Sequence, residues 1–144
     1  MSNNPTDDLT VGDEEILWRR ILPRDGPQAD WYKRENGEWR PTSVAFLDNR
    51  SSTHSLSAYV ASETDLNQLC RDYPHDNIAG FPSSIPRQYH HTIQRVPDGG
   101  YDSHVEITPP PETWGMEKRQ RNRRKSAAKA MALAAQWVHY RDPV

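Results

Sequence analysis

The stretch from Glu117 to His139, EKRQRNRRKSAAKAMALAAQWVH, decides how the rest of the chain is interpreted. At about 100° per residue, an α-helix over this stretch would place apolar and basic side chains on opposite sides. The apolar side contains Met116, Ala127, Ala130, Met131, Ala134, Trp137 and Val138. The basic side contains Lys118, Arg121, Lys125 and Lys129. We therefore predict one long helix over residues 117–139 that packs with one face and exposes the other.

Both ends of this predicted helix carry boundary signals. Three consecutive prolines at 109–111 cannot continue a strand, and Thr113 after them offers a side-chain oxygen to the first free N–H groups of a helix. Asp142 and Pro143 mark the other end, because proline cannot continue a helix. A helix of this length spans about 35 Å, which is enough to cross a small domain.

The charges divide unevenly between this helix and the rest of the chain. Residues 117–129 hold seven basic residues and one acidic residue, which leaves eleven basic and nineteen acidic residues elsewhere. Cations that lie close together near the positive end of the helix dipole lower helix stability. Two explanations remain open. The acidic body could neutralise the basic side, or the basic side could be the contact surface for nucleic acid or an acidic protein.

Length and composition bound the kind of protein. A chain of 144 residues with 34% apolar residues and twelve prolines predicts one domain with a modest core and long loops. We expect a disordered acidic tail over residues 1–12 and a single domain over residues 13–144. Cys70 is the only cysteine, which excludes an intramolecular disulfide and a four-cysteine zinc site and favours a cytoplasmic protein. No apolar run approaches the roughly 18 residues of a membrane span, and the polar start does not resemble a signal peptide.

The elements ahead of the helix are predicted from periodicity and turn signals. Leu17 and Ile21 have helical spacing with Pro23 as a stop, and Asn36-Gly37 is a strong hairpin signal. The predicted helices are 13–23 and 62–73, the predicted strands are 43–47, 54–61, 91–96 and 104–108, and residues 74–87 are expected to be irregular. The predicted fold class is therefore α+β, a small antiparallel sheet packed against the long C-terminal helix.

Four segments together resemble an uncharacterised family of small bacterial hypothetical proteins. They are LWRRI (17–21), WRPTSVAF (39–46), HSLSAYV (54–60) and SHVEI (103–107). The family has an arginine-rich apolar opening, a W-R-P-S-S-x-A-F stretch, and an H-x-x-V segment before a C-terminal helix. Here the residues after the histidine segment depart from that pattern, since Thr108 and prolines replace a glycine and paired lysines. The resemblance implies a bacterial or phage protein and assigns no activity.

A narrower resemblance lies within the helix itself. Residues 123–135, RRKSAAKAMALAA, are similar to the last helix of double-stranded-RNA-binding domains. In that family, lysines at the start of the helix contact phosphates and alanines pack on a three-stranded sheet. The resemblance implies that Lys125 and Lys129 would be the phosphate contacts.

A catalytic constellation is the alternative to a binding helix. Arg40, Ser43, His104 and Glu106 supply a cation, a hydroxyl, a base and a carboxylate that a sheet could bring together. An enzyme of this kind resembles small ADP-ribosyltransferase-like folds, which use an arginine or histidine, a serine or threonine, and a glutamate on three strands in that chain order. That resemblance implies a second set, formed by Arg19 or Arg20, Ser55 or Ser57, and Glu106.

The histidines are candidate metal ligands as well. His90, His91, His104 and Glu106 would be the residues of such a site. Neighbouring residues on a strand point to opposite faces, so His90 and His91 cannot both face one metal ion. One of these two histidines with His104 and Glu106 remains a possible but nonspecific set of ligands, and we predict no metal and no cofactor.

Taken together, the residues favour a non-enzymatic binding module of a bacterial or phage system over a small enzyme. The predicted contact residues are Lys118, Arg121, Lys125 and Lys129. We expect them to bind an acidic partner, with RNA or DNA as the first candidate and a protein as the second. No membrane contact is expected, and the sequence does not indicate an oligomeric state.

Overall fold

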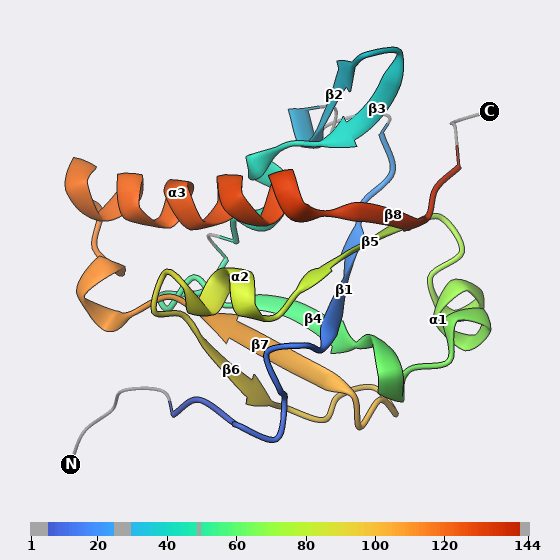
Figure 1. The fold of residues 1–144 in the computed structure, drawn as a ribbon, viewed down its shortest axis with the longest axis horizontal. Helices are drawn as coiled ribbons and strands as arrows, with labels where there is room; N and C mark the ends of the chain where they lie inside the picture. Colours follow the sequence, from blue (N-terminus) through green and yellow to red (C-terminus); the bar gives the residue numbers. More distant parts are fainter. Residues whose placement is uncertain (1–5, 25–29, 49, 142–144) are drawn as a thin grey trace.

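The computed structural model describes residues 6–24, 30–48 and 50–141, and its centre is one antiparallel sheet (Figure 1). Six strands form this sheet in the order β6-β7-β4-β1-β5-β8. Their bounds are β1 Ile16–Ile21, β4 Leu56–Val60, β5 Asn77–Pro82, β6 Thr92–Arg95, β7 His104–Thr108 and β8 Gln136–His139. A separate hairpin consists of β2 Tyr32–Glu35 and β3 Glu38–Pro41, and the helices are α1 Leu66–Asp72, α2 Ser84–Arg87 and α3 Lys118–Ala134. The predicted α+β class is confirmed.

The two faces of the sheet are covered differently. On one face, β-strand residues such as Leu17, Val60 and Val105 pack with Ala128 and Met131 of α3 in the main core. On the other face a smaller cluster forms around Tyr59, Leu69, Ile78 and Tyr101, with α1 lying over it. Alternation along each strand therefore decides which side chains face α3 and which face away from it.

The helix α3 is shorter than predicted and is followed by a strand. Its first turn is capped by Glu117 and Gln120, each side chain meeting the other residue's backbone N–H, and not by Thr113. The helix ends at Ala134, and residues 136–139 form β8, which pairs with the otherwise open edge of β5. Trp137 stacks on Tyr32 at 5.9 Å and its Nε1 donates to the Trp39 carbonyl at 2.8 Å. Sheet-edge pairing and aromatic packing thus override the helical pattern after Ala134.

Three other predictions of local structure are wrong. Residues 16–21, expected in a helix, form β1, because the burial of Leu17, Arg19 and Ile21 alternates along a strand. The stretch 74–87, expected to be irregular, contains β5 and α2. The strand predicted at 43–47 is a 3₁₀ helix over Ser43–Phe46.

Glycine 80 explains why a strand can pass through the stretch that was expected to be irregular. A Cβ added to Gly80 would lie 3.1 Å from Cγ2 of Val138 and 3.2 Å from Cγ2 of Ile16. The absence of a side chain leaves room for the side chains of the two flanking strands, β1 and β8, to lie over β5 at this point.

Several predicted elements are confirmed. The Asn36-Gly37 hairpin has φ angles of 52° and 81° at its two turn residues, as its turn type requires. The strand β4, the helix α1 and the β6–β7 hairpin all lie inside their predicted ranges. The cap of α1 is Asp65, whose carboxylate accepts from two backbone N–H groups of the first turn.

The expected N-terminal tail is shorter than residues 1–12. Residues 1–5 lie outside the described residues, but Val11 is fully buried in the main core. Asp7 accepts a hydrogen bond from the backbone N–H of Ile93 at 2.8 Å and pairs with Nε of Arg87 at 3.0 Å. Residues 6–12 therefore belong to the domain.

Candidate functional site

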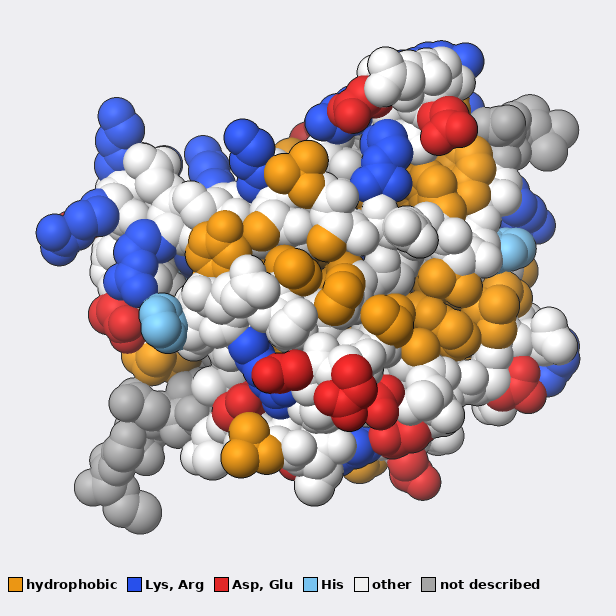
Figure 2. Space-filling model, in the orientation of Figure 1, with side chains coloured by type: hydrophobic (Ala, Val, Ile, Leu, Met, Phe, Trp, Pro, Cys, Tyr) orange, Lys and Arg blue, Asp and Glu red, His pale blue; other side chains and the backbone are white. Residues whose placement is uncertain are grey.

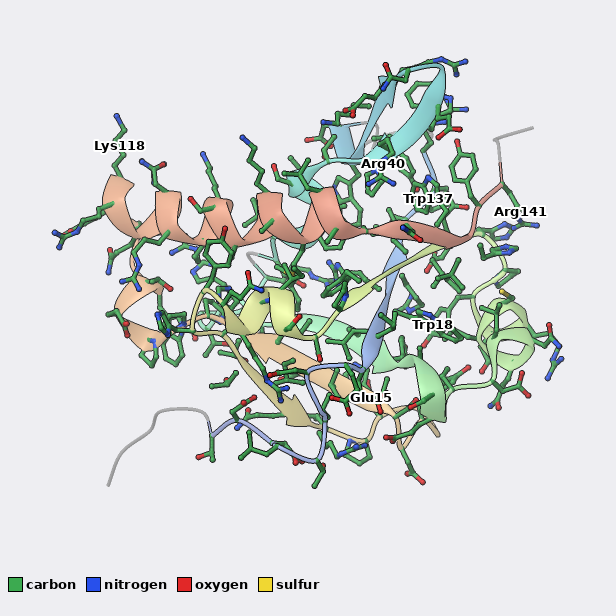
Figure 3. All side chains as sticks on the ribbon, in the orientation of Figure 1. Glu15, Trp18, Arg40, Lys118, Trp137 and Arg141 are labelled. Carbon is green, nitrogen blue, oxygen red and sulfur yellow. The ribbon has the colours of Figure 1, made fainter. Side chains whose placement is uncertain are left out.

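The candidate site is the solvent-facing side of α3, which we name the basic face. It consists of Lys118, Arg121, Lys125 and Lys129, and all four residues are exposed. In Figure 2 basic side chains follow the upper edge of the helix, and Figure 3 shows Lys118 at the free end of α3. The row extends for about 16 Å along the helix axis. The sequence predicted all four of these residues.

The opposite side of α3 explains why the basic face points outward. Ala127, Ala128, Met131 and Ala132 are buried, and small alanine side chains let the helix lie close to the sheet. Met116 was predicted on this apolar side and is 70% exposed, because it precedes the helix and lies outside the packed stripe. The apolar stripe that holds the helix thus runs over residues 127–135.

One basic residue of the helix has a structural role. Arg124 is 6% exposed, and its Nη1 donates to the carbonyls of Thr113 and Gly115, the second at 2.8 Å. These bonds tie the first turns of α3 to the 3₁₀ turn over Pro111–Thr113. Arg124 is therefore not available to a partner.

Few of the helix cations are neutralised by the body of the protein at contact distance. Arg123 lies 3.6 Å from Glu112, with both side chains about half exposed. Among the described residues, no carboxylate lies within 4.0 Å of a basic-face nitrogen. Many of the acidic side chains visible in Figure 2 lie below the helix. Within the described part of the chain, direct ion pairing therefore does not account for the basic face.

A groove continues the basic face toward the β2–β3 hairpin. It has a volume of about 260 Å³, and it runs between the last turns of α3 and the hairpin. Lys33 and Arg40 line it together with Lys129, and Nη2 of Arg40 donates to the Ala132 carbonyl at 3.1 Å. Figure 3 shows Arg40, which belongs to β3 of the hairpin, near this end of the helix. Lys33 was missed by the sequence reasoning, which had no means of placing the hairpin beside α3.

A second hollow of about 330 Å³ lies near the first half of α3. Its lining includes Tyr89, His91, Arg123 and Ser126. Burial lowers the pKa of His91 to about 4. The hydrogen bond between Nδ1 of His91 and the Tyr89 carbonyl, at 3.2 Å, raises the pKa, but its effect is smaller than that of burial. His91 is therefore neutral near pH 7, and Tyr89 presents a partly exposed ring 36% open to solvent.

The catalytic set proposed from the sequence is not brought together. Arg40 and Ser43 line the groove on the α3 side. On β7, Val105 and Ile107 face the main core, so His104 and Glu106 point to the opposite face of the sheet. His104 is buried, with its ring 5.4 Å from that of Tyr59 and its Nδ1 2.7 Å from the Val96 carbonyl.

The second enzyme-like set is brought together only in part. Ser57 and Glu106 are cross-strand partners on β4 and β7. Arg20 is held by Asp76 at 2.7 Å, and its guanidinium lies 3.6 Å above the Tyr73 ring. Arg19 makes its hydrogen bonds with two backbone carbonyls.

Metal and membrane features can be stated for the described part of the chain. Residues 6–24, 30–48 and 50–141 contain no group of three or more His, Cys, Asp or Glu side chains placed to hold a metal ion. In the same residues, no helix has both the length and the apolar character needed to cross a membrane.

Comparison of the chain with family models, with curated proteins and with solved structures finds no match in any of the three. Ala127 and Ala128 of α3 lie in the main core with residues of the six-stranded sheet, and the resemblance of the helix to double-stranded-RNA-binding domains stays a prediction.

Proposed function

We propose that this protein is a non-enzymatic binding module of a bacterial or phage system, and that its basic face contacts an acidic partner. Nucleic acid is the first candidate. The observation that carries the proposal is the row of four exposed cations on α3, which has no described carboxylate at contact distance. Cations arranged in this way gain binding energy by releasing counterions from a phosphate backbone.

The local geometry also supports a polyanion. Lys118, Arg121, Lys125 and Lys129 are three or four residues apart, so the Cβ atoms of neighbouring members lie about 5 to 6 Å from each other. Arg40 adds a cation at the groove beyond Lys129, whereas Lys33 pairs with Glu35 at 3.0 Å in the same groove. A backbone of regularly spaced phosphates can contact several of these side chains at once, and such contacts position a ligand without reading its sequence.

An acidic protein is the second candidate, and one residue favours it. Leu133 is 67% exposed and lines the groove together with Lys129 and Arg40. An exposed apolar side chain between cations can anchor a protein partner, because protein interfaces combine an apolar contact with a charged rim. Leu133 makes no contribution to phosphate binding on this view.

The test compares the wild-type protein with a variant in which all four basic-face residues are changed to glutamine. Binding to duplex RNA, duplex DNA and single strands is measured at two salt concentrations. We expect the wild type to bind at low salt with little sequence preference and the variant to bind far more weakly while remaining folded by circular dichroism. A folded variant that binds as well as the wild type would refute the proposal. If the wild type binds none of these nucleic acids, the nucleic-acid proposal is wrong and an acidic protein becomes the leading candidate. The variant Leu133→Ser would then be tested for weaker binding to a protein partner.

A further inference from the structure

A second concave site lies where β1 and β4 separate. The two strands pair at Leu17 with Val60 and at Trp18 with Tyr59, and the pairing does not continue beyond these residues. A cavity of about 150 Å³ opens at the separation, and its lining includes three arginines. None of its described lining residues belongs to α3, so this site is distinct from the basic face.

Arg19 fills the gap between the two strands. Its side chain is buried, with 5% of the residue exposed. Nε donates to the Ala45 carbonyl at 2.7 Å, and Nη1 donates to the Ser57 carbonyl at 3.0 Å. The third nitrogen, Nη2, has no acceptor among the described residues, and it keeps some exposure to solvent. A donor that is open to the cavity and has no acceptor can serve a ligand.

The charges around the cavity do not balance. Arg20 pairs with Asp76 at 2.7 Å and Arg50 pairs with Asp48 at 2.6 Å, whereas both hydrogen-bond acceptors of Arg19 are uncharged. Burial lowers the pKa of Arg19 to about 10, and the nearby Asp48 only partly opposes this, so Arg19 still carries its charge at neutral pH. A buried cation without a paired anion is costly, and an anion in the cavity would relieve that cost.

Leu22, Trp31 and two residues with hydroxyl groups complete the lining. Ser57 and Tyr59 are two residues apart on β4, so their side chains point to the same face of the sheet, and both line the cavity. Burial raises the pKa of Tyr59, so its hydroxyl stays protonated at neutral pH, but that hydroxyl already has Arg20 and Tyr73 as side-chain hydrogen-bond partners. The cavity is smaller than the roughly 300 to 1,000 Å³ of pockets that hold drug-sized ligands. Donors arriving from several directions suit an ion with oxygens on all sides better than a planar carboxylate.

We propose that this cavity binds a small tetrahedral oxyanion, phosphate or sulfate, held by the guanidinium groups of Arg19 and Arg50 and by the hydroxyl of Ser57, with Tyr59 lining the same cavity.

The test is a titration of the full chain with inorganic phosphate, and separately with sulfate, at constant ionic strength maintained with chloride. Calorimetry measures the affinity and ¹⁵N amide shifts locate the ion. The binding variants are Arg50→Gln, whose side chain is 83% exposed and so can be changed without disturbing the core, and Ser57→Ala. The matched control is Arg119→Gln, which removes the same charge from an exposed position on α3.

We expect saturable binding with the largest amide shifts around Arg50, Ser57 and Tyr59. Arg50→Gln should weaken the affinity by about tenfold or more, because it removes a charge-assisted hydrogen bond, while Arg119→Gln should leave it within about twofold. Shifts confined to α3 would overturn the proposal, as would the lack of saturable binding. Equal affinities for the wild type, Arg50→Gln and Ser57→Ala would overturn it as well.

Discussion

Replacing Arg124 with methionine should separate the structural arginine of α3 from the partner-binding ones. Methionine keeps a long side chain in the buried space but removes the donor to the carbonyls of Thr113 and Gly115. Each lost hydrogen bond to a charged group costs about 1.5 to 3 kcal/mol, and part of that is offset because the guanidinium no longer has to be desolvated. We therefore expect the free energy of unfolding to fall by about 2 to 4 kcal/mol.

Urea unfolding, followed by circular dichroism, measures this change as a lower midpoint with an unchanged slope. The matched control is Arg121→Met, which removes a charge from the exposed basic face and should alter stability by no more than about 0.5 kcal/mol. Arg124→Lys should fall between the two, since an ammonium group can keep one of the bonds. If Arg124→Met were as stable as Arg121→Met, the hydrogen bonds from Arg124 to the carbonyls of Thr113 and Gly115 would not stabilise the fold.

Two further predictions concern stability. The pKa of His91 in the folded state lies near 4, below its usual 6.5. As the pH falls, the unfolded chain therefore binds a proton at His91 before the folded protein does. The free energy of unfolding should fall between about pH 6.5 and 4 for this reason, by about 3 kcal/mol at most. His91→Gln should flatten this part of the stability profile in urea melts at pH 7, 5.5 and 4.5, and an unchanged profile would count against a buried neutral imidazole. Gly80→Val should lower the free energy of unfolding by about 1 to 3 kcal/mol, because its side chain would meet Val138, Ile16 and Trp18; a variant as stable as the wild type in the same assay would show that β5 has room to spare.

The sequence supported the fold class and the basic face because both depend on patterns within single segments. The exposed cations and the buried alanines of α3 lie where helical spacing places them. Asn36-Gly37 specified its hairpin because few residue pairs accept positive φ at both turn positions. Local chemistry was sufficient in these cases.

The errors came from segments whose structure depends on distant partners. Leu17 and Ile21 fit a helix at four-residue spacing and a strand at two-residue spacing, and only the pairing of β1 with β4 and β5 decides between them. The strand β8 exists because the edge of β5 accepts it. The arginine cavity could not be predicted either, because Arg19 and Arg50 meet through tertiary packing alone.

The most direct test of the basic face is the slope of log affinity against log salt for duplex DNA, measured for two variants that each lose two positive charges. Lys125→Gln with Lys129→Gln removes two basic-face contacts, and Arg71→Gln with Arg141→Gln removes two exposed arginines away from it. Each phosphate contact contributes about 0.9 to the slope. The proposed function predicts a slope smaller by about 2 for the lysine pair and an unchanged slope for the arginine pair. Equal slopes for both variants, with both proteins folded, would contradict a phosphate-binding role for α3.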